Sequence, residues 1–478
     1  MSRTGKEYLE RIRDGRTVWL GTERVTDVTA HPAFARAAAS IAGLYDAARD
    51  DALTVAGPDG RRTHRAFDIA RSYGDLVAKR RAHRAWAKQS FGFLGRSPDY
   101  MASGVAGFAA RPDVFVGQGF DGSEVAIELH GRLRGEDLFA AFTITNPSTD
   151  RSRPIAAQAS PELFLRVERE TDAGIVVSGS KMIGTGAVFA DEIVVGTIEP
   201  LRPEDTEFAF SFVLEPGTPG VSLVSRASYE QTAGGERDNP ISGRFDENDS
   251  LLVCESVFVP WERVLTYRDT KTTFGMWWDT PAYTNMAHQA STRFWTKLEF
   301  LAGLAVLITR GNGSADNPMV RAEVGRLLGY VQLARSSVLA AEAAYEQRPD
   351  DGGAVRLDTS ITFAQRILAG ELYPKFVHQI RMLSGGSLTQ VPASWDDLRD
   401  TEVGPLLATY AASVTQPADE RVALMKLAWD AVGSEFASRH AHYEQFYQGA
   451  PHVYLTQMTF TPDADACAAE AQRALDLA

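Results

Sequence analysis

The stretch Gly95-Arg-Ser-Pro-Asp-Tyr100 brings the side chains of Arg96 and Tyr100 to a predicted corner of the chain. Gly95 reaches backbone conformations that other residues resist, and Pro98 fixes its own φ and biases the residue before it toward extended geometry. The guanidinium of Arg96 can donate to carboxylate, phosphate or phenolate oxygens, and Tyr100 has one hydroxyl on an apolar ring. The alternative interpretation is a helix N-terminus with a surface arginine.

Several segments of the sequence resemble one protein family. They are residues 4–15, 95–100, 242–249 together with 257–262, and 427–436. These segments are similar to the oxygenase components of 4-hydroxyphenylacetate 3-monooxygenases, which are flavin-dependent, two-component aromatic hydroxylases. In that family, residues 95–100 match the substrate-binding motif. The resemblance therefore implies that Arg96 and Tyr100 bind the substrate and take part in catalysis.

The resemblance also implies scattered contacts with a flavin. Gly184-Thr-Gly186 is too short for a Rossmann or Walker loop, so no nucleotide-binding loop is predicted. By family match the cofactor-binding residues are Thr145, Asn146, Ser148, Arg151, Thr185, Ser384, Gly385 and Gly386. Arg151 can neutralise a pyrophosphate charge, and Thr185 matches a threonine beside the reactive edge of the flavin. From the residues alone, each segment is equally an ordinary strand-end turn, strand turn or helix stop.

Ionisation of a phenolic substrate needs a base or a cation, because a phenol has a pKa of about 10. In 4-hydroxyphenylacetate hydroxylases a histidine lies five residues before the proline of the Asn-Pro pair, and here that position is Phe142. In the halophenol-hydroxylating branch a histidine acts as the phenol base, and it matches His288. An imidazole with a pKa near 6.5 suits proton transfer at neutral pH. The resemblance thus makes His288 the candidate base, with a structural role as the alternative, and places Phe142 at the substrate ring.

The function that the resemblance implies is oxygen transfer to a phenolic or related aromatic substrate through a flavin C4a-hydroperoxide. FAD would act as FADH2 with O2 as cosubstrate, and a separate NADH-dependent flavin reductase would supply the reduced flavin. The substrate is a small aromatic molecule, either free or tethered to a carrier. We expect a homotetramer with the flavin bound partly across a subunit interface.

Two other flavoenzyme classes are possible for such a chain. A 4-hydroxybutyryl-CoA dehydratase-like lyase needs several cysteine thiolates for an iron–sulfur cluster, but the sequence has only Cys254 and Cys467, and Trp295 occupies an expected ligand position. An acyl-CoA dehydrogenase-like enzyme needs a catalytic carboxylate, and the sequence indicates none. Both are less favoured than a monooxygenase.

Composition excludes other classes. A net charge of −13 argues against nucleic-acid binding, which favours a basic face. No apolar run approaches a membrane span, no signal peptide is indicated, and two cysteines suit a reducing compartment, so we expect a cytoplasmic protein with no membrane association.

The elements that must position these residues change in character along the chain. Residues 1–140 are predicted to form a helical domain, with helices over 35–48 and 66–86. Short β-branched and aromatic runs at 141–145, 174–178, 207–213, 251–254 and 256–259 predict a β-domain over 141–270. Residues 271–478 are predicted to form a helical bundle, including a helix over 422–436 and a short docked helix over 462–478. This α+β, mainly α order is that of the acyl-CoA dehydrogenase-like fold, which the resembled family has.

Overall fold

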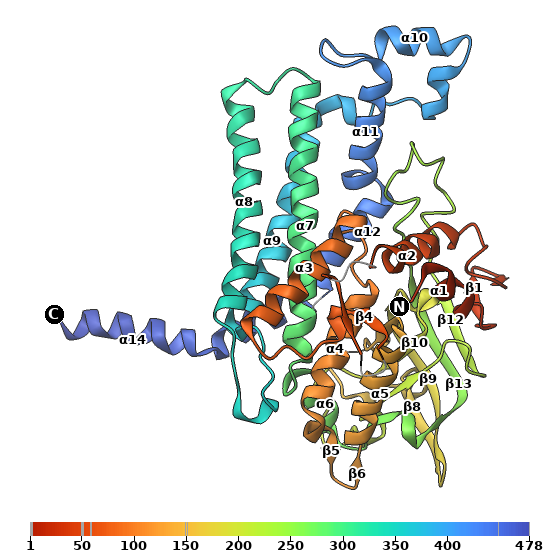
Figure 1. Ribbon diagram of the computed structural model, residues 1–478, viewed down its shortest axis with the longest axis vertical. Helices are drawn as coiled ribbons and strands as arrows, with labels where there is room; N and C mark the ends of the chain where they lie inside the picture. Colours follow the sequence, from red (N-terminus) through yellow and green to blue (C-terminus); the bar gives the residue numbers. More distant parts are fainter. Residues whose placement is uncertain are drawn as a thin grey trace.

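The computed structural model describes residues 3–48, 52–57, 60–148, 150, 152–447 and 449–477. The chain passes from helices through two sheets to a second set of helices (Figure 1). The first helices are α1 (Gly5–Arg11), α2 (Ala35–Ala47), α3 (Tyr73–Gln89), α4 (Pro98–Ala110) and α5 (Ser123–Glu136). Proline at the first position of α4 costs no hydrogen bond and presets φ, so this helix begins directly after the Arg96 corner.

Two sheets occupy the middle of the chain. The larger has the order β2-β1-β12-β13-β9-β8, and the smaller β14-β11-β10-β7. The larger contains β1 (Val18–Leu20), β2 (Glu23–Val25), β8 (Arg166–Thr171), β9 (Gly174–Thr185), β12 (Val221–Ser225) and β13 (Asp249–Pro260), and the smaller contains β7 (Ala140–Thr143), β10 (Glu192–Val195), β11 (Phe210–Leu214) and β14 (Val264–Tyr267). Two hairpins, β3 (Thr54–Ala56) with β4 (Arg62–His64) and β5 (Val116–Gly117) with β6 (Phe120–Asp121), lie outside these sheets.

The pairing of β9 with β13 fixes the position of one candidate site residue. The two strands run antiparallel, with Thr185 opposite Asp249 at the end of the ladder. The two strands expected over 251–254 and 256–259 are a single strand, because a bulge between Cys254 and Val257 absorbs the irregular residues. β1 and β2 also join this sheet, so the N-terminal part is not purely helical.

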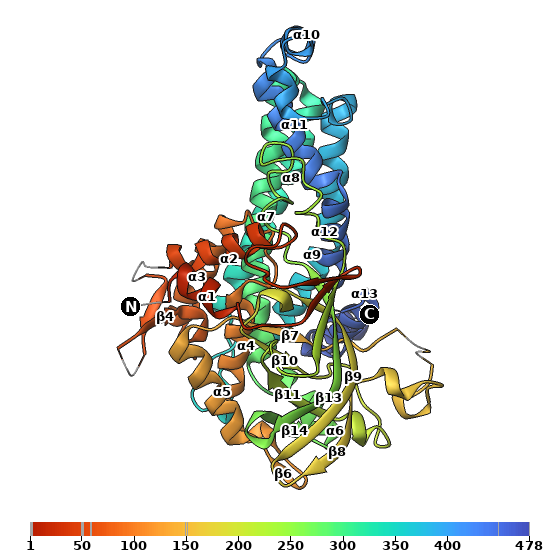
Figure 2. The same cartoon turned by 90° about the vertical axis from the view of Figure 1, so that its right-hand side faces the viewer.

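A helical bundle stands on the β-sheets (Figure 2). Its elements are α6 (Thr270–Trp278), α7 (Ala282–Gly311), α8 (Pro318–Ala343), α9 (Thr359–Ser384), α10 (Val403–Tyr410), α11 (Ala418–Val432), α12 (Glu435–Phe446), α13 (Pro451–Gln457) and α14 (Pro462–Asp476). α7 is about 45 Å long and contacts α3, α4, α8 and α9, so it joins the bundle to the N-terminal helices. None of the described helices has the length and apolar character needed to span a membrane.

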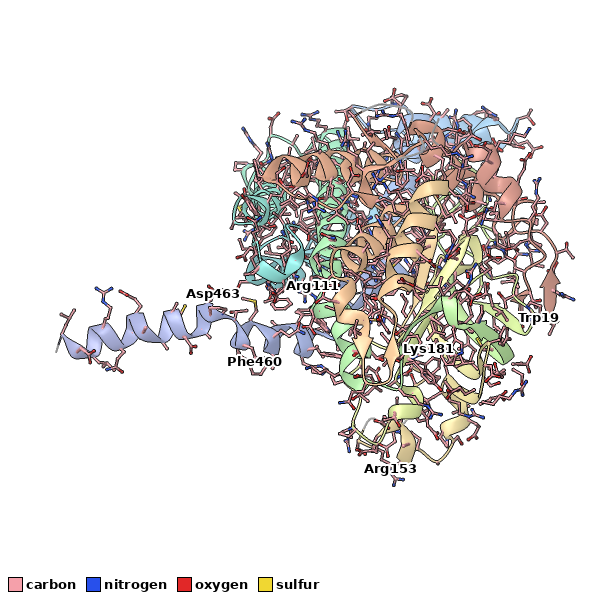
Figure 3. All side chains as sticks on the ribbon, turned by 60° about the horizontal axis from the view of Figure 1, so that its bottom comes forward. Trp19, Arg111, Arg153, Lys181, Phe460 and Asp463 are labelled. Atoms are coloured by element: carbon pink, nitrogen blue, oxygen red, sulfur yellow. The ribbon has the colours of Figure 1, made fainter. Side chains whose placement is uncertain are left out.

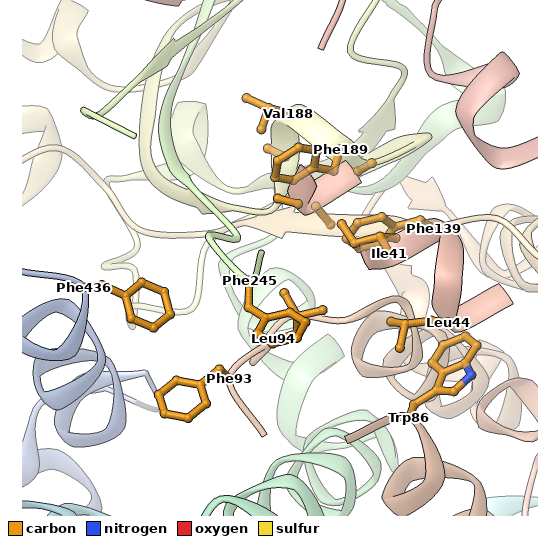
Figure 4. Close-up of a cluster of buried hydrophobic side chains, with 14 of the residues drawn as sticks. Ile41, Leu44, Trp86, Phe93, Leu94, Phe139, Val188, Phe189, Phe245 and Phe436 are labelled. Carbon is orange, nitrogen blue, oxygen red and sulfur yellow. The ribbon is translucent and has the colours of Figure 1, made fainter. Parts of the chain in front are cut away.

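One apolar core connects all three parts of the chain. It includes Trp86 from the N-terminal helices, Phe139 and Phe189 from the connections next to the strands, and Phe436 from α12 (Figure 4). The boundaries near 140 and 270 stay predictions. The shared core means that the parts pack together as one body.

Three predicted helices differ from the structure. The helix expected over 66–86 begins only at Tyr73, where Ser72 caps it by accepting from the Asp75 amide. The helix expected over 422–436 ends at Val432, because Gly433 breaks it before α12. α14 does not dock on its own chain: it extends from the body with every described residue from Pro462 onward half-buried or exposed, and Phe460 is 81% exposed at its base (Figure 3).

Candidate active site

The Arg96 corner is packed between α12 and the segment that precedes β13. The Arg96 amide donates to Glu247 Oε2 over 2.8 Å. A Cβ at Gly95 would overlap the hydroxyl end of Tyr443, so only glycine fits there. The sequence predicted a turn at residues 95–100, and the packing of Gly95 against Tyr443 explains why this turn is rigid.

Four aromatic rings surround the Arg96 side chain, and we call this group the aromatic box. The guanidinium carbon of Arg96 lies 4.0 Å from the ring centroid of Tyr100, 4.9 Å from Phe142, 5.4 Å from Tyr447 and 5.6 Å from Tyr443. Each ring face attracts the cation. Because the four residues come from α4, β7, α12 and the turn after α12, the box closes only when all three parts of the chain meet.

Arg96 keeps an unused donor in this buried place. Its Nη2 donates to the Tyr447 carbonyl over 2.8 Å, but the buried Nη1 has no partner among the described residues. No described carboxylate forms an ion pair with the guanidinium either. Burial lowers the pKa of Arg96, but Tyr100, Tyr443 and Glu247 raise it, and the net direction is upward. The box therefore contains a charged donor that an incoming oxygen can satisfy.

Phe142 forms the apolar wall of the aromatic box. Its ring stacks on Tyr100 with centroids 5.6 Å apart and an interplanar angle of 28°, and it lies 6.2 Å from the Trp277 ring. The structure thus brings Arg96, Tyr100 and Phe142 together, and their binding of a substrate stays a prediction. Phenylalanine can hold a ring by stacking but cannot transfer a proton.

His288 lies outside the aromatic box, with no described contact to Arg96 or Tyr100. Its Nε2 donates to Glu342 Oε1 over 2.8 Å, and its ring packs edge-on against His83 with centroids 5.6 Å apart. His83 Nδ1 in turn lies 2.7 Å from Asp99 Oδ2, next to Tyr100 in the chain. Burial lowers the pKa of His288 to about 4. The described contacts of His288 lead to the box only through His83 and Asp99, and the role of His288 as the phenol base stays a prediction.

The turn after β7 is fixed to β9. The Met182 amide donates to the Thr145 carbonyl over 2.9 Å, and the buried Lys181 Nζ donates to Asn146 Oδ1 over 2.6 Å. Ser148 is exposed, with its hydroxyl 4.0 Å from the Met182 sulfur. Arg151, also predicted to bind the cofactor, lies outside the described residues. Burial lowers the pKa of Lys181 to about 7.

A network of charged residues joins the Thr185 turn to the Arg96 corner. The Thr185 hydroxyl donates to Asp249 Oδ1 over 2.6 Å. Arg439 of α12 donates from Nη2 to the same Asp249 oxygen over 2.6 Å and from Nη1 to Glu247 Oε1 over 2.7 Å. Since Glu247 also accepts from the Arg96 amide, residues 247–249 hold both predicted binding segments at once.

The third predicted cofactor segment lies at the other end of the bundle. Ser384 ends α9, and Gly385 and Gly386 are exposed, with space around both Cα atoms. Asn312, directly after α7, donates to the Leu383 carbonyl, whereas Gln289 of α7 donates to Ser97 beside the Arg96 corner. Along α7 these two contacts are about 35 Å apart. A single chain therefore does not bring Ser384, Gly385 and Gly386 to the aromatic box.

Comparison with known families decides the relationship. A family model described as "4-hydroxyphenylacetate 3-hydroxylase N terminal" matches residues 4–266, and one described as "4-hydroxyphenylacetate 3-hydroxylase C terminal" matches residues 274–476. The chain belongs to the 4-hydroxyphenylacetate 3-hydroxylase family. The resemblance predicted from the sequence is confirmed.

Individual relatives agree with this assignment. The pyoverdin chromophore biosynthetic protein PvcC of Pseudomonas aeruginosa is 37% identical over 456 residues, which cover 93% of this chain and 89% of the relative. The crystal structure of the oxygenase component of 4-hydroxyphenylacetate 3-monooxygenase complexed with FAD and 4-hydroxyphenylacetate matches with a TM-score of 0.92 at 30% identity, covering all of both chains. A 4-hydroxybutyryl-CoA dehydratase from N. maritimus shares the fold at 19% identity, with a TM-score of 0.90 over all of this chain and 96% of that one. The acyl-CoA dehydrogenase-like, mainly α fold is confirmed.

In this member of the 4-hydroxyphenylacetate 3-hydroxylase family, sequence reasoning missed the residues that hold the corner in place. These are Glu247, Asp249, Arg439, Tyr443 and Tyr447. A signal for part of this set was present, because residues 246–249 concentrate three carboxylates where β13 begins. Acidic side chains at such a place need cationic partners.

Proposed function

We propose that this chain hydroxylates a phenolic substrate next to its hydroxyl group, with the phenolic oxygen bound by Arg96 in the aromatic box. The chain is a flavin-dependent monooxygenase of the oxygenase-component type, as its family is. The observation that supports the phenolic substrate is the buried, charged Arg96, whose Nη1 has no partner among the described residues, between the rings of Tyr100 and Phe142.

Arg96 can prepare a phenol for oxygen transfer. A cation within hydrogen-bond distance favours the ionised phenol and so lowers a pKa that is ordinarily about 10. The negative charge of a phenolate spreads onto the ring carbons next to the oxygen, which makes them better nucleophiles. Phe142 and Tyr100 would hold the ring by stacking, and the closed box would exclude water.

FAD is the cofactor, and reduced FAD supplies the activated oxygen when it is bound. The residues of this chain fit a flavin beside the box. Gly186 has a φ of 76°, which lets the backbone turn closely, and the preceding Thr185 offers a hydroxyl oxygen to which no described group donates. Thr145 and Ser148 present further hydroxyls on the turn that β9 holds in place. We assign cofactor contacts to Thr145, Asn146, Ser148, Thr185 and, by family match, Arg151.

The assembly that we propose is a homotetramer served by a separate flavin reductase. Ser384, Gly385 and Gly386 cannot join Thr185 within one chain, so a flavin that touches both sets must lie between subunits. α8 exposes Met319, Leu328 and Leu333, and α14 projects from the body, which leaves apolar surface for a second copy to cover.

Other flavoenzyme chemistry is less consistent with the site. The two cysteines cannot form a cluster together, since Cys254 lies in β13 and Cys467 on the projecting α14. The carboxylates closest to the box are already occupied: Glu247 by the Arg96 amide and Arg439, and Asp99 by His83 and Ser97. Neither is free to abstract a proton from an acyl thioester, as a dehydrogenase base must.

Product analysis with matched substrates tests the proposal. The enzyme would receive reduced FAD, O2 and a panel of 4-substituted phenols, each paired with its O-methyl ether and presented free or as a pantetheine thioester. We expect ring hydroxylation of phenols and none of the ethers, because an ether cannot ionise. Equal conversion of a phenol and its ether would contradict the role of Arg96, and conversion of the thioesters alone would assign a tethered substrate.

A further inference from the structure

The cross-strand pair of Thr185 and Asp249 has a fixed hydrogen-bond direction. The two residues are directly opposite in the β9–β13 ladder, and their side-chain oxygens are 2.6 Å apart. A threonine hydroxyl can donate one hydrogen bond and accept others, and only its neighbours decide which it does. Here the neighbour is a carboxylate.

Asp249 is held in the ionised state. Arg439 donates to both of its oxygens, over 2.6 and 2.9 Å, and Arg226 Nε donates to Oδ2 over 2.8 Å. Burial raises the pKa of the Asp249 carboxyl, but the two arginines outweigh burial and hold this pKa well below its usual range. An ionised carboxylate can only accept, so the Thr185 proton must point at Asp249.

The outward side of the Thr185 hydroxyl is therefore an acceptor. Thr185 is buried, and none of the described residues donates to this oxygen, so its lone pairs have no partner in the described part of the chain. The two redox forms of a flavin differ at the ring nitrogen N5: the oxidised form has no hydrogen there and accepts, whereas the reduced form has a hydrogen and donates. An acceptor-only hydroxyl matches the reduced form alone.

We propose that Asp249 is a positioning residue that fixes Thr185 as a hydrogen-bond acceptor and so makes the site prefer reduced to oxidised FAD. This inference rests on the proposed place of Thr185 at the reactive edge of the flavin. It explains how an oxygenase that receives its flavin from another protein releases the oxidised form and takes up the reduced one. It also gives a role to Asp249, for which the sequence supplied none.

Anaerobic titrations of wild type and Thr185→Val with oxidised and with reduced FAD test the inference. Valine keeps the shape of threonine and removes the oxygen. We expect the affinity for reduced FAD to fall about tenfold while that for oxidised FAD stays the same, because only the reduced form loses a hydrogen bond. An equal loss for both forms would refute the inference, since it would mean that the hydroxyl also donates. No change for either form would instead place Thr185 away from the flavin and overturn the cofactor assignment of the proposed function.

The variant Asp249→Asn tests the same idea from the other side. An amide at this position can donate to the Thr185 oxygen, which leaves the Thr185 hydroxyl free to donate to the flavin. The preference for reduced FAD should therefore shrink about tenfold. The matched control is Asp246→Asn, which removes an equal charge from the same Arg226 but has no bond to Thr185. In the Thr185→Val background, Asp249→Asn should have no further effect on the preference. The inference would be refuted if Asp249→Asn still reduced the preference for reduced FAD in the Thr185→Val background. It would also be refuted if Asp246→Asn reduced this preference as much as Asp249→Asn does. If Asp249→Asn does not fold, Thr185→Val alone decides.

Discussion

The guanidinium of Arg96 faces the ring of Phe142, with its carbon 4.9 Å from the ring centroid. A cation thus lies against a side chain that cannot exchange a proton, at the position where the family resemblance led us to expect a histidine. A phenol in the box must therefore be ionised by the charge of Arg96, or by a base outside the box such as His288. Substitutions at Gly95, at His288 and at the proposed subunit interface probe these roles.

Gly95→Ala should damage the corner without touching a ligand. The new Cβ would overlap the Tyr443 hydroxyl end, so Tyr443 or the corner must move. Overpacking of this kind costs about 1–3 kcal/mol, and displacement of Arg96 should also weaken phenol binding. Thermal unfolding and phenol titration measure the two effects. Gly131→Ala in α5, where nothing lies within 4 Å of the new atom, is the control and should stabilise slightly. Wild-type phenol affinity in Gly95→Ala would mean that the corner does not position Arg96.

His288→Ala should uncouple the reaction if His288 is the phenol base. Loss of a general base typically costs ~10²–10⁴-fold, so hydroxylated product should collapse while consumed O2 appears as H2O2. Because burial lowers the pKa of His288 to about 4, wild-type coupling should persist to about pH 5 and fall only below it. Product and H2O2 yields across pH measure this. A normal product yield from His288→Ala would leave ionisation to Arg96 alone.

The same histidine should make stability depend on pH. Its folded pKa of about 4 lies below the ordinary value of 6.5, so the unfolded chain binds the proton more readily between these values. The stability associated with neutral His288 is fully present above pH 6.5 and is lost as pH falls toward 4, by up to roughly 3 kcal/mol. Urea unfolding of wild type and His288→Gln should therefore show wild type losing more stability over this window. Parallel curves for the two proteins would contradict this.

Subunit mixing should show whether the flavin site is shared. At a phenol concentration that just saturates wild type, Arg96→Ala and Gly386→Phe should each lose most of their activity alone, the first through weakened substrate binding and the second because a ring at this open, exposed place blocks the flavin. In a mixed homotetramer, one interface combines an intact Arg96 with an intact Gly386, so dissociation and reassembly should restore activity. A mixture as inactive as its parts would place each site within one chain, and a solution mass of a single active chain would exclude the tetramer.

Sequence reasoning could locate side chains whose chemistry is local. Arg96, Tyr100 and Phe142 were named through the family resemblance of short stretches around them, and their roles toward the substrate stay predictions. Glu247, Arg439 and Tyr443 were not named, because they reach the corner only through tertiary packing and lie more than 150 residues further along the chain. His288 illustrates the limit: the resemblance suggested a base, but its partner Glu342 comes from α8, and only the packing of α7 against α8 shows where the ring points. Likewise, the sequence did not predict the end of α11 at Gly433, because the apolar pattern of the helix continues past this residue.

The most direct test of the account is a single-turnover reaction with reduced FAD and ¹⁸O2 over a range of phenol concentrations, for wild type, Arg96→Ala and Arg96→Lys. The account predicts one ¹⁸O atom in the ring beside the phenolic oxygen for wild type. It predicts an apparent phenol affinity about tenfold to a hundredfold weaker for Arg96→Ala, because a hydrogen bond to a charged group contributes about 1.5–3 kcal/mol. Arg96→Lys keeps the charge but loses the planar fork of donors, so its phenol affinity should lie between those of wild type and Arg96→Ala. A product without ¹⁸O in the ring, or an Arg96→Ala variant that binds the phenol as wild type does, would contradict it.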